Sequence, residues 1–73
     1  METMERRAVR SRDIALIGYD ALNQILEITF RIGGVYHYAG VPEEIYQELL
    51  TSPSQGRYFD QQIKHKYPYT KVS

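Results

Sequence analysis

Hydrophobic and polar residues alternate most regularly between Gln24 and Arg31. Leu26, Ile28 and Phe30 are separated by polar residues, which is the period of a strand with one buried face. We therefore predict a strand over residues 24–31, with these three side chains directed into the core.

Two further strands flank this one. Residues 13–19 are rich in β-compatible side chains, which predicts a strand. A turn is predicted at 20–23, where Asp20 and Asn23 can bond nearby backbone groups. Gly33-Gly34 then turns the chain into a strand over Val35–Ala39. The short connections predict an antiparallel meander of three strands.

Helical periodicity begins after Pro42, a residue that suits the first turn of a helix. Apolar residues at 45, 46, 49 and 50 form one stripe, and the first helix ends near Pro53. Ser54 can cap a second helix that runs to about His65 and carries an apolar row spaced by four residues. We expect both helices to cover one face of the sheet, giving an α+β fold of order β-β-β-α-α.

The direction of Tyr36 and Tyr38 depends on the loop before them. A two-residue loop at Gly33-Gly34 would place both rings beside Arg31, as an exposed aromatic and cationic platform that could stack bases. A bulged loop of residues 31–33 would instead send both rings into the core, turn His37 outward and leave Ile32 exposed. The bulged loop is favoured because burying His37 without partners costs more than exposing one isoleucine.

Composition narrows the possible functions. Nine basic and nine acidic residues give no net charge, but basic residues gather near both ends and acidic residues lie between them. There is no cysteine, which excludes a disulfide or a thiolate site, and no run of apolar residues approaches a membrane span. We expect a cytoplasmic protein with no cofactor and no metal, and we find no pattern typical of an enzyme.

Several short motifs, taken together, resemble the KTSC domain, a module named for the carboxy-terminal end of some lysyl-tRNA synthetases. The motifs are Ile14-x-x-Ile17-Gly18-Tyr19-Asp20, Leu26-x-Ile28-x-Phe30, Gly33-x-x-Tyr36-x-Tyr38-x-x-Val41-Pro42, Ser54-x-Gly56-x-Tyr58-Phe59 and Ile63-x-x-x-Tyr67. The resemblance assigns residues 9–69 to the domain, with a flexible arm at 1–8 and a tail at 70–73. It implies a stand-alone bacterial module of unestablished function, for which attachment to a synthetase suggests RNA binding.

We therefore expect a non-catalytic module that binds RNA weakly. Basic residues of the second helix would contact phosphates, and the platform residues would take part under the first loop geometry. The candidate nucleic-acid contacts are Arg31, Tyr36, Tyr38, Arg57, Lys64 and Lys66. The alternative is a protein-interaction or homodimerisation module that uses the open face or an edge of the sheet, where residues 25, 32, 35 and 39 are apolar.

Overall fold

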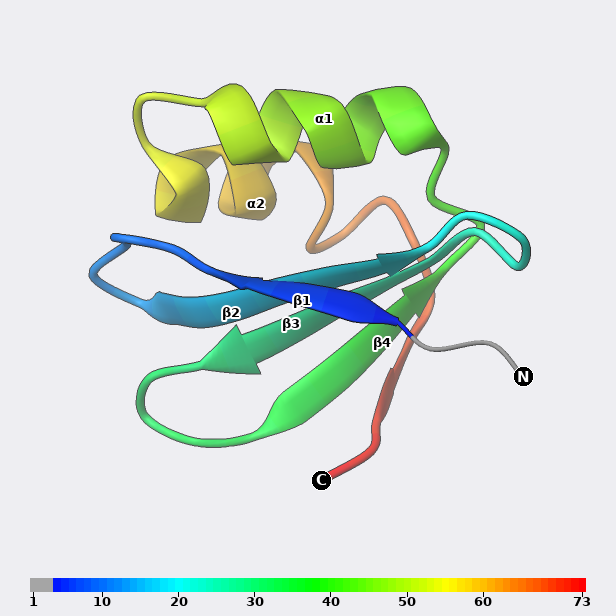
Figure 1. Cartoon of the computed structure of the whole chain (residues 1–73), viewed down its shortest axis with the longest axis horizontal. Helices are drawn as coiled ribbons and strands as arrows, with labels where there is room; N and C mark the ends of the chain where they lie inside the picture. The colour runs from blue at the N-terminus through cyan, green and yellow to red at the C-terminus, as the bar shows by residue number, and fades with distance from the viewer. Residues whose placement is uncertain (1–3) are drawn as a thin grey trace.

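A computed structural model describes residues 4–73 as an antiparallel sheet covered on one face by two helices (Figure 1). The strands lie in sequence order across the sheet, each one antiparallel to its neighbours. The elements are β1 (Glu5–Ala8), β2 (Ile14–Asp20), β3 (Ile25–Phe30), β4 (Val35–Ala39), α1 (Glu43–Thr51), α2 (Gln55–Gln62) and β5 (Tyr69–Lys71).

The expectation of three strands is wrong, because the sheet has five strands within residues 4–73. β1 forms within the predicted N-terminal arm and β5 extends into the predicted tail, one strand at each edge of the sheet. Every residue in both strands is exposed, so neither strand has the alternation that a buried face imposes on a sequence. Residues 1–3 of the predicted arm lie outside the described part of the chain.

The β3–β4 hairpin has the bulged loop that the sequence favours. Leu26 pairs with Tyr38 and Ile28 pairs with Tyr36, while the Phe30 amide donates to the Gly34 carbonyl at 3.1 Å. Gly33 and Gly34 have φ angles of 118° and 97°, which side chains disfavour. The alternative register, with an exposed platform of both tyrosines beside Arg31, is therefore wrong. Ile32 at the tip of the loop is 98% exposed.

The helices begin where the sequence predicts, but the second one ends early. The Ser54 side chain accepts a hydrogen bond from the Arg57 amide and caps α2. The chain leaves the helix at Ile63, which has a φ of −124°. The prediction extended this helix to about His65 and counted Lys64 and Lys66 as its basic residues. Both lysines instead lie in the turn that follows α2.

The core fills the space between the helices and the inner face of the sheet. Tyr19 connects the two layers, because its ring stacks on Tyr46 of α1 with centroids 4.7 Å apart and its hydroxyl donates to the Val41 carbonyl at 2.5 Å. The buried hydrophobic residues of this core are Ile14, Ile17, Leu26, Ile28, Tyr38, Val41, Tyr46, Leu49, Phe59 and Ile63.

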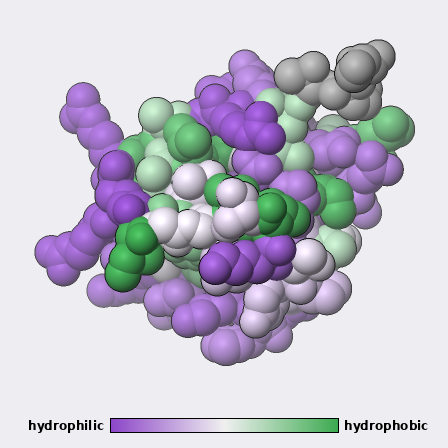
Figure 2. All heavy atoms as spheres, turned by 90° about the horizontal axis from the view of Figure 1, so that it is seen from below, coloured by the Kyte–Doolittle hydropathy of each residue, from purple (hydrophilic) through white to green (hydrophobic). Residues whose placement is uncertain are grey.

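The opposite face of the sheet carries small apolar areas separated by hydrophilic side chains (Figure 2). One row across it pairs Arg6, Gly18, Glu27 and His37 on neighbouring strands. Arg6 crosses Gly18 and donates to Glu27 at 2.5 and 3.2 Å, and His37 Nε2 lies 2.8 Å from the second carboxylate oxygen. A Cβ at Gly18 would lie 2.8 Å from Met4 Sδ and 3.1 Å from Arg6 Cγ, so the glycine leaves room for both side chains to cross β2.

Glu27 is only 5% exposed although no helix covers it. The hydrogen bond from Arg6 lowers the pKa of its carboxyl, and the His37 contact acts in the same direction against the opposing effect of burial. The network therefore holds the carboxylate ionised and ties β1 to β3 and β4.

Replacement of Gly33 tests the loop. A Cβ at Gly33 would meet no atom within 4 Å, so Gly33→Ala isolates the strain of the positive φ angle. We expect a loss of about 1–3 kcal/mol in the free energy of unfolding, measured by urea titration. Ile32→Ser at the same loop is the control and should be nearly neutral. A Gly33→Ala protein as stable as the wild type would contradict this loop geometry.

Acid should weaken the Glu27 network. Because the pKa of Glu27 in the folded protein is below its ordinary value of 4.5, the stabilisation is complete above that pH and is lost as pH falls through the lower value. Glu27→Gln should cost about 1–3 kcal/mol near neutral pH and should reduce the loss of stability on acidification. Urea titrations at neutral and acidic pH measure both effects.

The matched control is Glu44→Gln, which changes an exposed carboxylate in the first turn of α1. Its acid sensitivity should remain close to that of the wild type. The same acid sensitivity in Glu27→Gln as in the wild type would show that Glu27 does not contribute to the pH dependence.

Candidate functional site

A hollow of about 990 Å³ opens where the β3–β4 loop, β5 and the turn after α2 meet. Residues far apart in the sequence come together here, since β5 lies beside β4 and the chain approaches it directly from the end of α2. The lining residues are Arg12, Asp13, Phe30, Arg31, Ile32, Gly33, Tyr36, Tyr38, Phe59, Asp60, Lys64, His65 and Tyr69.

Aromatic rings form the wall of the hollow. Tyr69 packs against Tyr36 and Tyr38 with centroids 5.7 and 5.8 Å away, and Phe59 meets Tyr38 edge to face at 5.3 Å. Exposure rises from Tyr38, at 4%, through the half-buried Tyr36 to Tyr69, at 61%. Tyr69 therefore offers the most accessible ring surface for a ligand, while Tyr38 offers almost none.

Tyr38 is also one of the residues that line the hollow. Burial raises the pKa of its hydroxyl to about 12, and the neighbouring Tyr36, Tyr69 and Asp60 act in the same direction. At neutral pH this hydroxyl is therefore protonated and able to donate a hydrogen bond.

Charges of both signs surround the rings, with Arg12, Arg31 and Lys64 against Asp13 and Asp60. Arg31 is already engaged: its guanidinium donates to the carbonyls of Ser11 at 2.7 Å and Val9 at 2.8 Å. These two hydrogen bonds from Arg31 hold the β1–β2 connection beside the β3–β4 loop. Lys64 and Arg12 are left as the cations best placed to meet a ligand.

The structure brings together only part of the set of residues that the sequence suggested. Arg31, Tyr36, Tyr38 and Lys64 line the hollow. Arg57 borders a separate hollow of about 490 Å³ near the start of α2, and Lys66 donates to Gln62 and lines neither.

Tyr69 was missed because its strand was missed. The run of Tyr69, Thr70 and Val72 after Pro68 is the one signal that points to a strand there.

The described residues contain no group of three or more His, Cys, Asp or Glu side chains that could hold a metal ion. None of the helices in residues 4–73 is long and apolar enough to cross a membrane. The hollow combines stacking surfaces, hydrogen-bond donors and cationic side chains, which are features of a site that binds a ligand.

Comparison with known proteins identifies the family. The family model described as the KTSC domain matches residues 10–67. A crystal structure of a KTSC domain protein from Yersinia pestis superposes with a TM-score of 0.94 at 45% identity, covering 97% of this chain and all of the other. A protein of Stutzerimonas stutzeri, described as uncharacterized, is 41% identical over 70 residues, which are 94% of this chain and 99% of that protein.

A second group of relatives is much longer. A protein named lysine–tRNA ligase from Trichormus variabilis is 40% identical over 55 residues, which cover 75% of this chain but 10% of the ligase. A ligase of the same name from Nostoc punctiforme is 35% identical over 60 residues and 11% of its length. The family model covers most of the sequence and the fold agrees along almost its whole length, so the chain belongs to the KTSC domain family.

Proposed function

We propose that this KTSC module binds single-stranded RNA weakly, with a base stacked on Tyr69 at the mouth of the aromatic hollow. The observation that carries the proposal is the 61% exposure of Tyr69 beside Tyr36 and the cationic Lys64. A flat aromatic surface next to a positive charge suits a base and its phosphate, since every base has a face that can stack.

The roles of the candidate residues follow from their surroundings. Tyr69 stacks the base, Tyr36 extends the wall behind it, and the Tyr38 hydroxyl donates a hydrogen bond from the floor. Lys64 and Arg12 contact phosphates. Arg31 holds the loop, while Arg57 and Lys66 lie outside the hollow and contribute little.

The charge balance limits the affinity. Nine acidic residues offset nine basic ones, so no overall field attracts a polyanion, and Asp13 and Asp60 border the site itself. One stacked base contributes roughly 1–3 kcal/mol. We therefore expect a dissociation constant on the order of 10⁻⁴ M at physiological salt, as for nonspecific nucleic-acid binding.

The long relatives support the choice of RNA. Their name, lysine–tRNA ligase, includes an RNA, and the matched segment is about a tenth of each of them. An enzyme that handles RNA gains from an added weak RNA contact, because linking two sites makes the second binding event intramolecular.

Fluorescence anisotropy with a labelled short single-stranded RNA, at low and moderate salt, tests the proposal. Tyr69→Thr keeps a strand-forming residue but removes the ring, and should weaken binding about five- to 150-fold, the equivalent of one lost stack. Lys64→Gln should weaken binding and reduce the slope of log affinity against log salt by about 0.7, the value for one phosphate contact on a single strand.

Lys66→Gln is the matched control, because this lysine is two positions away and does not line the hollow. It should leave affinity and salt slope close to those of the wild type. If the wild type shows no binding at low salt, or if the two lysine variants weaken binding equally, the proposed site is wrong.

A further inference from the structure

The edge of the sheet formed by β1 is a second surface with the features of a binding site. β1 pairs only with β2 among the described residues. The amide of Val9, just after the strand, donates to the Ala15 carbonyl at 3.1 Å and so points toward β2. Backbone groups alternate in direction along an antiparallel strand, so the N–H and C=O groups of Arg6 and Ala8 point away from the sheet.

A groove runs beside this edge on the helical side. Its volume is about 630 Å³, and one wall follows the chain from Arg7 to Arg10 while the other is the end of α1 and the connection to α2. Leu50 and Val9 supply apolar surface, and Gln47 and Gln55 supply polar groups. An extended chain added to β1 would therefore send every second side chain into a formed groove.

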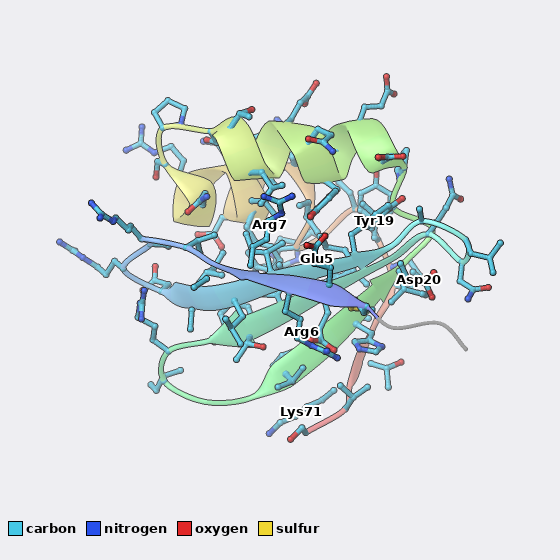
Figure 3. All side chains as sticks on the ribbon, viewed as in Figure 1. Glu5, Arg6, Arg7, Tyr19, Asp20 and Lys71 are labelled. Carbon is cyan, nitrogen blue, oxygen red and sulfur yellow. The ribbon has the colours of Figure 1, made fainter. Side chains whose placement is uncertain are left out.

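The charge that lines the groove is positive. Arg7 and Arg10 line it, and among the described residues no acidic side chain does. Glu5, two positions before Arg7 on the same face of β1, is the acidic residue of the strand. Arg6 and Arg7 project to opposite faces of the strand (Figure 3). Arg6 already donates two hydrogen bonds to Glu27. Arg7 and Arg10 are therefore the cations that could contact a chain bound in the groove.

A second copy of the same strand finds no register at this edge that is free of opposed arginines. An antiparallel pair of β1 strands centred on position 7 places Arg7 opposite its own copy, and a pair centred on position 8 places Arg6 opposite Arg10. A pair centred on position 6 places Glu5 opposite Arg7 twice but also places Arg6 opposite its own copy. Like charges directly opposite each other destabilise a strand pair. A chain that carries carboxylates would turn the same geometry into attraction.

We infer that β1 accepts an extended acidic peptide segment of a partner protein as a sixth strand. The backbone of the segment pairs with the outward groups of Arg6 and Ala8. Its alternate side chains are carboxylates that enter the groove and meet Arg7 and Arg10, while the apolar residues between them lie on the opposite face of the sheet. This surface is separate from the aromatic hollow, since β1 and β5 are opposite edges of the sheet.

The probe is a labelled peptide of alternating glutamate and valine, titrated into the intact chain by anisotropy and by amide NMR shifts. We expect binding that weakens with salt, with protection of the Ala8 amide from hydrogen exchange. A peptide with lysine in place of glutamate should not bind. Absence of binding by the acidic peptide at low salt would overturn the inference.

Two variants separate charge from strand pairing. The double variant Arg7→Gln/Arg10→Gln should weaken binding about two- to thirtyfold, as expected for two exposed ion pairs. Ala8→Pro removes an amide that faces away from β2, so β1 can still pair with β2 while the added strand loses its donor. Ala8→Pro should abolish protection and most of the binding, and unchanged binding would overturn the inference.

Arg12→Gln is the control for charge, because Arg12 does not line this groove and should leave peptide affinity unchanged. Tyr69→Thr should also have no effect, which separates this surface from the RNA site. Light scattering should show that the wild type is a monomer. If the wild type is instead a dimer and Ala8→Pro makes it a monomer, the partner at this edge is a second copy of the chain and the inference is overturned. Displacement of the peptide by a short RNA would show a general polyanion surface and overturn the strand-pairing inference.

Discussion

Within residues 4–73, two short helices can bury only one face of the five-stranded sheet, and much of the structure follows from that limit. The inner face receives the aliphatic and aromatic core, with Tyr19 linking β2 to α1 through a stacked ring and a hydrogen bond. The outer face has no second layer among the described residues. Its strands must be stabilised there by contacts between side chains that lie along the sheet itself.

Glu27 is the centre of those contacts. A carboxylate with 5% exposure is costly unless its oxygens are paired, and Arg6 and His37 pair both of them from two different strands. The reach of Arg6 across β2 depends on Gly18, where a side chain would block the path. A polar network thus takes the place that a hydrophobic layer has in a larger domain, and it attaches an edge strand that has no buried residue of its own.

Sequence reasoning succeeded where burial leaves a pattern. Leu26, Ile28 and Phe30 fixed β3 and its inner face, and Gly33 with Gly34 indicated the turn whose geometry the structure confirms. The edge strands gave no such pattern, since all their side chains are exposed, and Tyr69 was lost from the candidate site together with β5. The separation of Arg57 and Lys66 from Lys64 was not predictable either, because it depends on where α2 ends and how the chain then turns.

The row from Arg6 through Gly18 to Glu27 and His37 has a consequence for how such chains diverge. None of these positions is free to vary alone. A larger residue at Gly18 would crowd the side chain of Arg6 where it crosses β2. Loss of Arg6 would leave the buried carboxylate of Glu27 without its counter-ion. Substitutions at these four positions are therefore expected to covary among related sequences, whereas the exposed Ile32 at the loop tip can vary independently.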